Sequence, residues 1–278
     1  MLNKLNVALN YFQEHGTAAF LRRLVQEFKP EAVDRHHIDE VGIVIKALDI
    51  KHNKGLMIDV GAHYGGTSYP FCNAGWRVYA FEPDSLNRAN LIKKVGMFSN
   101  ITIDDRALSN EEKESVTFYR SQQSTGISGL SAFHSTHTAA DTVAVTTLAK
   151  VIEQNGIKEI DFLKIDTEGF DKFVLEGLPW QTHAPKVIVT EFEDFKTKPL
   201  GYDFDDFATY LTSKGYQVLV SEWKPIVVYG QQHSWSEFKA YPCKLSSERA
   251  WGNFIACKDP QTFARVLAVC EEIKRRLH

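Results

Sequence analysis

Residues 56–67 read LMIDVGAHYGGT, an apolar segment that leads directly into a glycine-rich turn. Four of the first five side chains are apolar, which is typical of a short buried strand. Gly61, Gly65 and Gly66 allow positive φ angles and let a ligand approach the backbone closely. A helix that begins after such a turn offers unpaired backbone N–H groups to an anion. The stretch therefore predicts the first strand–turn–helix unit of an α/β fold, with either a ligand site or an ordinary tight turn at its bend.

The spacing within this turn restricts the ligand. Dinucleotide-binding folds use G-x-G-x-x-G, but His63 stands where the second glycine would be, so a pyrophosphate would lack its close backbone approach. Asp59, at the end of the strand, would repel a phosphate and could accept a hydrogen bond from an ammonium group. A ligand that carries both an amine and a carboxylate, such as the methionine part of S-adenosylmethionine, fits this turn better.

A second acid and a third loop extend the predicted site. Glu82 follows the predicted strand 77–81 and lies 21 residues after Gly61, close to the spacing at which a carboxylate meets ribose hydroxyls. The loop 104–109 follows the predicted strand 101–103 and should lie beside an adenine ring. We expect Asp105 there to accept from the exocyclic amine, and we include Ala107 among the cofactor-binding residues.

The segment 162–171 predicts the chemistry. Asp166, Glu168 and Asp171 fall within six residues after a buried strand, at the sheet edge where α/β folds place ligands. Removing a proton from an acceptor hydroxyl needs a nearby base, and Asp166 and Glu168 are the nearest candidates, together with His134 from a loop. Alternatively, these acids only stabilise a helix N-terminus. Asp166 with Glu191 or Glu193 offers oxygen ligands for Mg²⁺, although no metal is the preferred interpretation.

Helix and strand signals alternate along the chain and predict a parallel sheet covered on both faces. The first 52 residues read as a helical extension, with apolar stripes at 21–28 and 38–48, and residues 53–278 as the main domain. Two β-segments, 115–119 and 142–146, interrupt the alternation and are joined by a polar loop, 121–140, of the length that is often functional. Further strands are predicted at 161–165, 186–190, 217–220 and 254–257, and further helices at 67–74, 85–95 and 205–213 and at the C-terminus.

Composition excludes several classes of protein. The chain has 278 residues and a net charge of −3 without long runs of one sign, so a nucleic-acid surface is not indicated. The four cysteines have neither zinc nor disulfide spacing, which suggests reduced thiols in the cytoplasm. No stretch predicts a signal peptide or an integral membrane segment.

Four ordered motifs resemble the FkbM-type S-adenosylmethionine-dependent methyltransferases of the class I fold. They are residues 58–62 (IDVGA), 81–83 (FEP), 107–109 (ALS) and 164–169 (KIDTEG), and the resemblance covers about residues 57–194. It implies a Rossmann-like sheet of seven strands with the last antiparallel, and O-methylation of a sugar, glycan or secondary metabolite. By position, Asp59, Gly61 and Gly65 would hold the methionine part and Glu82 the ribose, while Asp166 and Glu168 would border the methyl group. The family most often has Asn at the position of His63.

Two other functions remain open at this point. A nicotinamide-dependent oxidoreductase would share the fold, although His63 argues against it. A non-catalytic nucleotide-binding module would share the scaffold, although the intact acids at 166, 168 and 171 argue against it. The expected partner is a small-molecule or carbohydrate acceptor.

Overall fold

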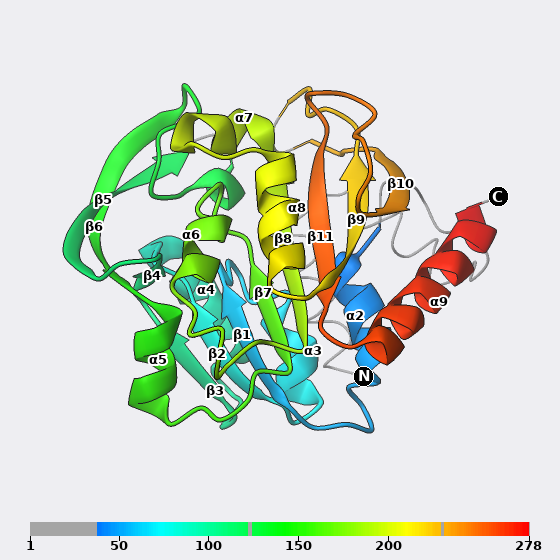
Figure 1. Cartoon of the computed structure of the whole chain (residues 1–278). Helices are drawn as coiled ribbons and strands as arrows, with labels where there is room; N and C mark the ends of the chain where they lie inside the picture. Colours follow the sequence, from blue (N-terminus) through cyan, green and yellow to red (C-terminus); the bar gives the residue numbers. More distant parts are fainter. Residues whose placement is uncertain (1–37, 122–123, 229–230, 278) are drawn as a thin grey trace, which may run out of the picture.

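A large sheet forms the centre of the computed structural model, which describes residues 38–121, 124–228 and 231–277 (Figure 1). Its strand order is β10-β9-β11-β8-β7-β1-β2-β3. The strands are β1 (Leu56–Val60), β2 (Arg77–Phe81), β3 (Ile101–Asp104), β7 (Phe162–Ile165), β8 (Val187–Glu193), β9 (Gln217–Trp223), β10 (Trp235–Ala240) and β11 (Trp251–Cys257).

The predicted α/β class is confirmed. Strands β3, β2, β1, β7 and β8 pair in parallel, and β11, the last strand in the sequence, pairs antiparallel with both β8 and β9. The seven predicted sheet strands are all present. An eighth, β10, pairs antiparallel with β9 and extends the sheet at its edge. The predicted strand boundaries agree with the structure to within a few residues.

Helices cover both faces of the sheet, as predicted. Because side chains alternate along a strand, Ile58 and Val60 of β1 pack in one core and Met57 in the other. The first core lies under α5 (Leu148–Asn155), α6 (Asp171–Glu176) and α8 (Phe204–Ser213). The second lies under α2 (Glu40–Leu48), α3 (Ser68–Asn73), α4 (Ser85–Val95) and α9 (Pro260–Leu277). Two short helical segments, α7 (Asp194–Thr197) and η2 (Lys198–Leu200), connect β8 to α8.

Local capping explains where several helices begin. The Asp84 carboxylate accepts from the backbone N–H groups of Leu86 and Asn87 and so caps α4. Asp203 and Asp206 form a reciprocal capping box at the start of α8. These caps fix the chain directions after β2 and before α8, both of which lie close to the carboxyl edge of the sheet.

A second, three-stranded sheet stands beside the first. It has the order β4-β6-β5, with β4 (Ala107–Leu108), β5 (Lys113–Ser121) and β6 (His137–Thr146). The two β-segments predicted without a helix between them therefore pair with each other, in antiparallel orientation. Their connection contains the short 3₁₀ segment η1 (Thr125–Ile127), so the polar loop predicted for 121–140 is shorter and partly structured.

The start of the described chain is part of the main packing. The Glu40 carboxylate of α2 accepts hydrogen bonds from Ser221 Oγ at 2.7 Å and from Trp223 Nε1 at 2.8 Å, both on β9. The helix predicted around 21–28 lies outside the described residues, and the division of the chain at residue 52 stays a prediction. None of the helices described is long and apolar enough to cross a membrane. The four cysteines are free thiols.

Candidate functional site

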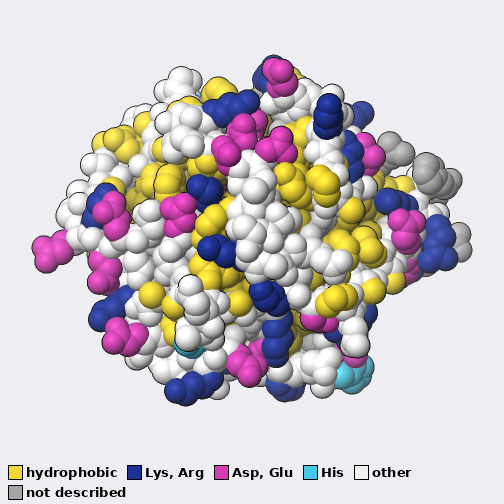
Figure 2. Space-filling view, in the orientation of Figure 1, with side chains coloured by type: hydrophobic (Ala, Val, Ile, Leu, Met, Phe, Trp, Pro, Cys, Tyr) yellow, Lys and Arg dark blue, Asp and Glu magenta, His cyan; other side chains and the backbone are white. Residues whose placement is uncertain are grey.

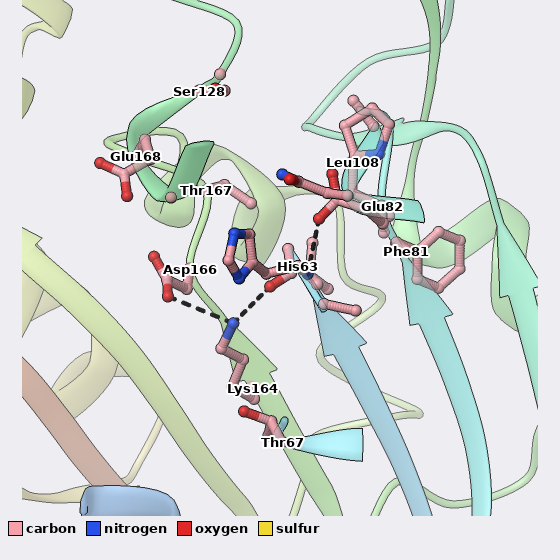
Figure 3. Close-up of a pocket in the computed structure, with 18 of the residues that line it drawn as sticks. His63, Thr67, Phe81, Glu82, Leu108, Ser128, Lys164, Asp166, Thr167 and Glu168 are labelled. Atoms are coloured by element: carbon pink, nitrogen blue, oxygen red, sulfur yellow. Dashed lines mark hydrogen bonds and ion pairs between the residues drawn. The ribbon is translucent and has the colours of Figure 1, made fainter. Parts of the chain in front are cut away.

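A cavity of about 420 Å³ opens at the carboxyl edge of the main sheet, and we call it the rim cavity. Four chain segments that the sequence places far apart meet around it: 60–67 after β1, 81–83 after β2, 106–108 at β4 and 164–168 at the end of β7. Residues 125–130, around η1, close it on a further side. Figure 3 shows Glu82 on one side of the cavity and Asp166 and Glu168 on the other, with His63 between them.

The glycine turn after β1 requires glycine at its bend. Gly61 has a φ of 74°, and a Cβ added there would lie 1.9 Å from the Asp166 carbonyl oxygen. Gly65 has a φ of 77° and packs against Leu91 of α4. His63 adopts a φ of 48°, which is unusual for a residue with a side chain. The turn thus brings the ends of β1 and β7 together and directs the backbone N–H of His63 at Glu82.

Glu82 is 5% exposed and is held by the backbone around it. Its carboxylate accepts from His63 N at 2.7 Å and from Asp84 N at 2.9 Å. Burial raises the pKa of Glu82 to about 7, while these two hydrogen bonds favour its ionised form. The residue predicted to hold a ribose therefore lines the cavity with a fixed carboxylate.

Asp59 lies behind the cavity rather than in its lining. Its carboxylate accepts from Ser68 Oγ at 2.6 Å and lies 3.7 Å from Lys164 Nζ on the neighbouring strand β7. Lys164 does line the cavity, where its ammonium donates to the Gly61 carbonyl at 2.7 Å and lies 3.4 Å from Asp166. Burial lowers the pKa of Lys164, but the Asp166 and Asp59 carboxylates raise it by more. An ionised Lys164 therefore links the glycine turn after β1 to the acidic segment after β7.

Lys164 was not among the predicted site residues. The signal was nevertheless present, because a lysine stands inside the otherwise apolar strand 162–165. Buried lysines need a partner, so such a position indicates an ion pair.

The loop after β3 contributes other residues than the acid predicted there. Asp105 is exposed and lies outside the lining, whereas Arg106, Ala107 and Leu108 line the cavity. Asp104 holds Arg106 through an ion pair of 2.6 Å. Of the two predicted residues in this loop, only Ala107 therefore lies at the cavity.

Thr125 of η1 forms part of a cover over the glycine turn. Its hydroxyl lies 3.0 Å from His63 Nε2 and 3.0 Å from the Tyr64 hydroxyl. Asn87 Nδ2 donates to the Thr125 carbonyl at 3.4 Å, and the Asn87 Oδ1 atom is buried without a hydrogen-bond partner at the cavity wall. Sequence reasoning flagged the loop as a whole but missed Thr125 and Asn87.

Glu168 lies in the cavity wall with a φ of 58°, a strained backbone conformation of the kind that clusters at functional sites. The residue is 7% exposed, and its carboxylate contacts Lys196 Nζ of α7 at 2.7 Å. Burial raises the pKa of Glu168 to about 7, although Lys196 favours the ionised form. Asp166 is half-exposed beside it. Asp171 does not line the cavity, because its carboxylate accepts from Thr167 and Thr190 and supports the turn from behind.

Lys196 is the centre of a buried ion cluster that sequence reasoning missed. Its ammonium contacts Glu191 at 2.8 Å and Glu193 at 2.9 Å in addition to Glu168. Asp166, Glu168 and Glu191 bring carboxylate oxygens within 4.8 Å of one another, close enough to surround a cation. The ammonium of Lys196 is already the counter-ion of two of these three acids. The expected absence of a metal, and the alternative of Mg²⁺ at Asp166 and Glu191, both stay predictions.

His134 does not lie in the rim cavity. It lines a neighbouring groove together with Glu193 and the first residues of α7. Its Nδ1 atom lies 2.8 Å from Thr136 Oγ1, and its backbone N–H donates to His137 Nδ1 at 3.1 Å. His134 therefore lines a different depression from Asp166 and Glu168, the two other predicted catalytic residues.

Three of the solved structures to which this chain is similar are methyltransferases. The precorrin-6y C5,15-methyltransferase of Geobacter metallireducens GS-15 has 14% identity and a TM-score of 0.39, over 82% of this chain and 94% of that one. The O-methyltransferase TomG of Streptomyces achromogenes, in complex with SAM, has 10% identity and a TM-score of 0.40, over 85% and 88%. The magnesium protoporphyrin IX methyltransferase ChlM of Synechocystis PCC 6803, with bound SAH, has 11% identity and a TM-score of 0.41, over 91% and 99%. No curated protein matches the sequence.

The sequence itself matches a family. The methyltransferase FkbM domain matches residues 59–218, which is more than half of the chain. The matched range includes the four segments that meet around the rim cavity and residues 125–130. This match contradicts the nicotinamide-dependent alternative. The chain belongs to the FkbM methyltransferase domain family and is an S-adenosylmethionine-dependent methyltransferase.

Proposed function

We propose that this protein transfers the methyl group of S-adenosylmethionine to a hydroxyl oxygen of a sugar, glycan or secondary metabolite. The observation that carries this proposal is the Glu168 carboxyl group. It is a buried acid on the cavity wall with a pKa raised to about 7, which suits a general base at neutral pH.

The rim cavity has the size and the polar groups that the donor needs. Its volume of about 420 Å³ falls in the range of pockets that enclose molecules of this size. Glu82 has lone pairs left for the ribose hydroxyls after it accepts from two backbone groups. The unpartnered Asn87 Oδ1 atom supplies a further acceptor in the wall. The Gly61–Gly65 turn and His63 would hold the methionine part, and Ala107 and Leu108 would face the adenine.

The donor supplies an electrophilic methyl carbon when it is bound. The acceptor oxygen forms a bond to this carbon while the carbon–sulfur bond breaks, so that the products are a methyl ether and S-adenosylhomocysteine. The acceptor's proton passes to the Glu168 carboxylate, which must be ionised beforehand. Asp166, half-exposed at the mouth, would orient the hydroxyl. Lys196 keeps Glu168 in place by its ion pair.

Calorimetry tests the binding of the donor, and a turnover assay tests the transfer of its methyl group to an oxygen. S-adenosylmethionine and S-adenosylhomocysteine should each bind with a 1:1 stoichiometry, and no heat from either would overturn the assignment of the cavity. Incubation with labelled donor and a panel of hydroxylated sugars and metabolites, followed by mass spectrometry, should give a product heavier by one methyl group on oxygen.

The Glu168→Gln variant tests the base. We expect turnover to fall by about 10²–10⁴-fold, the usual contribution of a general base, while the dissociation constant of S-adenosylhomocysteine stays unchanged. Undiminished turnover would remove Glu168 from the mechanism. Glu222→Gln is the control, because Glu222 is also a buried acid paired with a lysine but lies on β9, outside the cavity lining.

A further inference from the structure

A second depression lies beside the rim cavity, and we call it the α7 groove. It has a volume of about 510 Å³ and is lined by His134, residues 193–195 with Lys198, residues 226–228 and residues 248–250. Figure 2 shows basic and acidic side chains next to hydrophobic ones over α7, at the top of the view. The groove therefore combines apolar and charged walls at the same sheet edge as the rim cavity.

The apolar part of the α7 groove is unusually exposed. Phe195 is 61% exposed, Val227 92% and Val228 38%, and these three are half of the six large hydrophobic side chains that are exposed in the described part of the chain. Apolar side chains that gather in one exposed groove are typical of binding surfaces, since single exposed ones are usually scattered.

The charges of the groove are largely satisfied within the protein. Lys198 pairs with Asp194 at 3.0 Å, and Glu193 pairs with Lys196. Glu248 and Arg249 are exposed and bring one charge of each sign to the wall. The groove therefore offers polar contacts without an excess charge that would require an ionic ligand.

The groove lies beside the rim cavity, and the buried ion cluster around Lys196 stands between them. Glu193 lines the groove, Glu168 lines the rim cavity, and both contact the same Lys196 Nζ. The Glu168 oxygen lies 2.7 Å and the Glu193 oxygen 2.9 Å from Lys196 Nζ, so these two oxygens are at most about 5.6 Å apart. The Glu193 wall of the groove therefore lies within about the width of one ring of the Glu168 carboxyl group.

We propose that the α7 groove binds the body of the methyl acceptor, and that this body is an uncharged, apolar ring system that carries the reacting hydroxyl. Phe195 and Val227 contact its faces, and Glu248 and Arg249 hydrogen-bond its polar substituents. This inference rests on the proposed O-methyl transfer but concerns a surface that the donor does not occupy. It narrows the acceptor to ring-bearing alcohols and phenols and excludes bare sugars.

The test uses 2-naphthol as the probe, because it joins an apolar ring system to a hydroxyl, and glucose as the hydroxyl-rich compound without an apolar body. Saturation-transfer NMR and fluorescence titration on the full chain, loaded with S-adenosylhomocysteine, should show binding of 2-naphthol and none of glucose. Phe195→Ser and Val227→Ser should each weaken 2-naphthol binding about tenfold, the effect of removing one apolar side chain from a contact.

Two controls show whether a loss of 2-naphthol binding comes from the groove itself. Met97→Ser removes a hydrophobic side chain whose exposure, 74%, lies between those of Phe195 and Val227 and that does not line the groove, and it should leave 2-naphthol binding unchanged. S-adenosylhomocysteine should bind all three variants as it binds the native protein, and its failure to bind the native protein would instead overturn the donor site. No 2-naphthol binding, binding that the two groove variants do not weaken, or equally tight binding of glucose would overturn the groove proposal.

Discussion

Replacing Lys196 by Met removes the one cation among three buried carboxylates and leaves the side-chain volume nearly unchanged. Lys196 is 2% exposed, and its ammonium contacts Glu168, Glu191 and Glu193 within 2.9 Å. Breaking a buried ion pair by removing one partner typically costs about 3–5 kcal/mol of stability, because the remaining charges stay buried and unpaired. We expect a loss of this size for Lys196→Met.

This loss of stability can be expressed as a fall in melting temperature. The entropy of unfolding is about 2.1 cal/mol/K per residue, so a chain of 278 residues gives about 0.6 kcal/mol/K. The melting temperature of Lys196→Met should therefore fall by about 5–8 °C in differential scanning calorimetry. Lys150→Met is the control, since Lys150 pairs with Glu153 on an exposed helix surface, and its melting temperature should not change measurably.

The loss should also depend on pH. Burial raises the folded-state pKa of Glu168 to about 7, above its ordinary value, so folding favours the protonated acid and this group destabilises the fold as pH rises from about 4.5 through 7. Without Lys196 the carboxylates lose the charge that favours their ionised form. The difference between native protein and variant should thus be larger at pH 8 than at pH 6. An equal or smaller difference at pH 8, or no fall in melting temperature at either pH, would refute the reasoning.

Three further changes test the turn, the ribose site and the base. Gly61→Ala places a Cβ 1.9 Å from the Asp166 carbonyl at a φ of 74°, so chemical denaturation should show a loss of about 2 kcal/mol or more, whereas Gly66→Ala, with no atom within 4 Å of its new Cβ, should be tolerated. Glu82→Gln should weaken S-adenosylhomocysteine binding about 10–100-fold in calorimetry, and a change within twofold would contradict its role. Turnover at saturating donor and acceptor should rise with pH through about 7 as Glu168 loses its proton, and a flat rate between pH 6 and 8 would contradict a base with this pKa.

The site residues that the sequence predicts are those that come directly after a strand. The turn at Gly61 and the acid at Glu82 each follow a strand directly, and parallel strands bring their carboxyl ends to one edge. Glu168 follows a strand in the same way. For these residues the spacing along the chain determines the position in space.

The parts that escaped prediction depend on contacts between distant segments. Lys196 meets Glu168 only because α7 folds back over the end of β7, and nothing near residue 196 indicates this. β10 was missed because a bulge between Trp235 and Glu237 interrupts the strict alternation on which strand prediction relies. α5 did carry a signal, since Leu148, Val151 and Ile152 form an apolar stripe between the Thr147 cap and Gly156, but the helix is short and follows a strand without a break.

The charges around the rim cavity should also make the affinity for the donor differ from the affinity for its demethylated product. Five carboxyl groups line the cavity, against two basic side chains, Arg106 and Lys164. The acids are Asp39, Glu40, Glu82, Asp166 and Glu168. A rim with excess acid attracts a sulfonium cation, and the attraction disappears once the methyl group has left and the sulfur is neutral. We therefore expect the donor to bind more tightly than its demethylated product, in proportion to the number of ionised acids. Because burial raises the pKa of Glu168 to about 7, this preference should grow from pH 6 to pH 8. The two calorimetric titrations proposed above measure it, and a product that binds as tightly as the donor at pH 8 would show that the acids act on the acceptor alone.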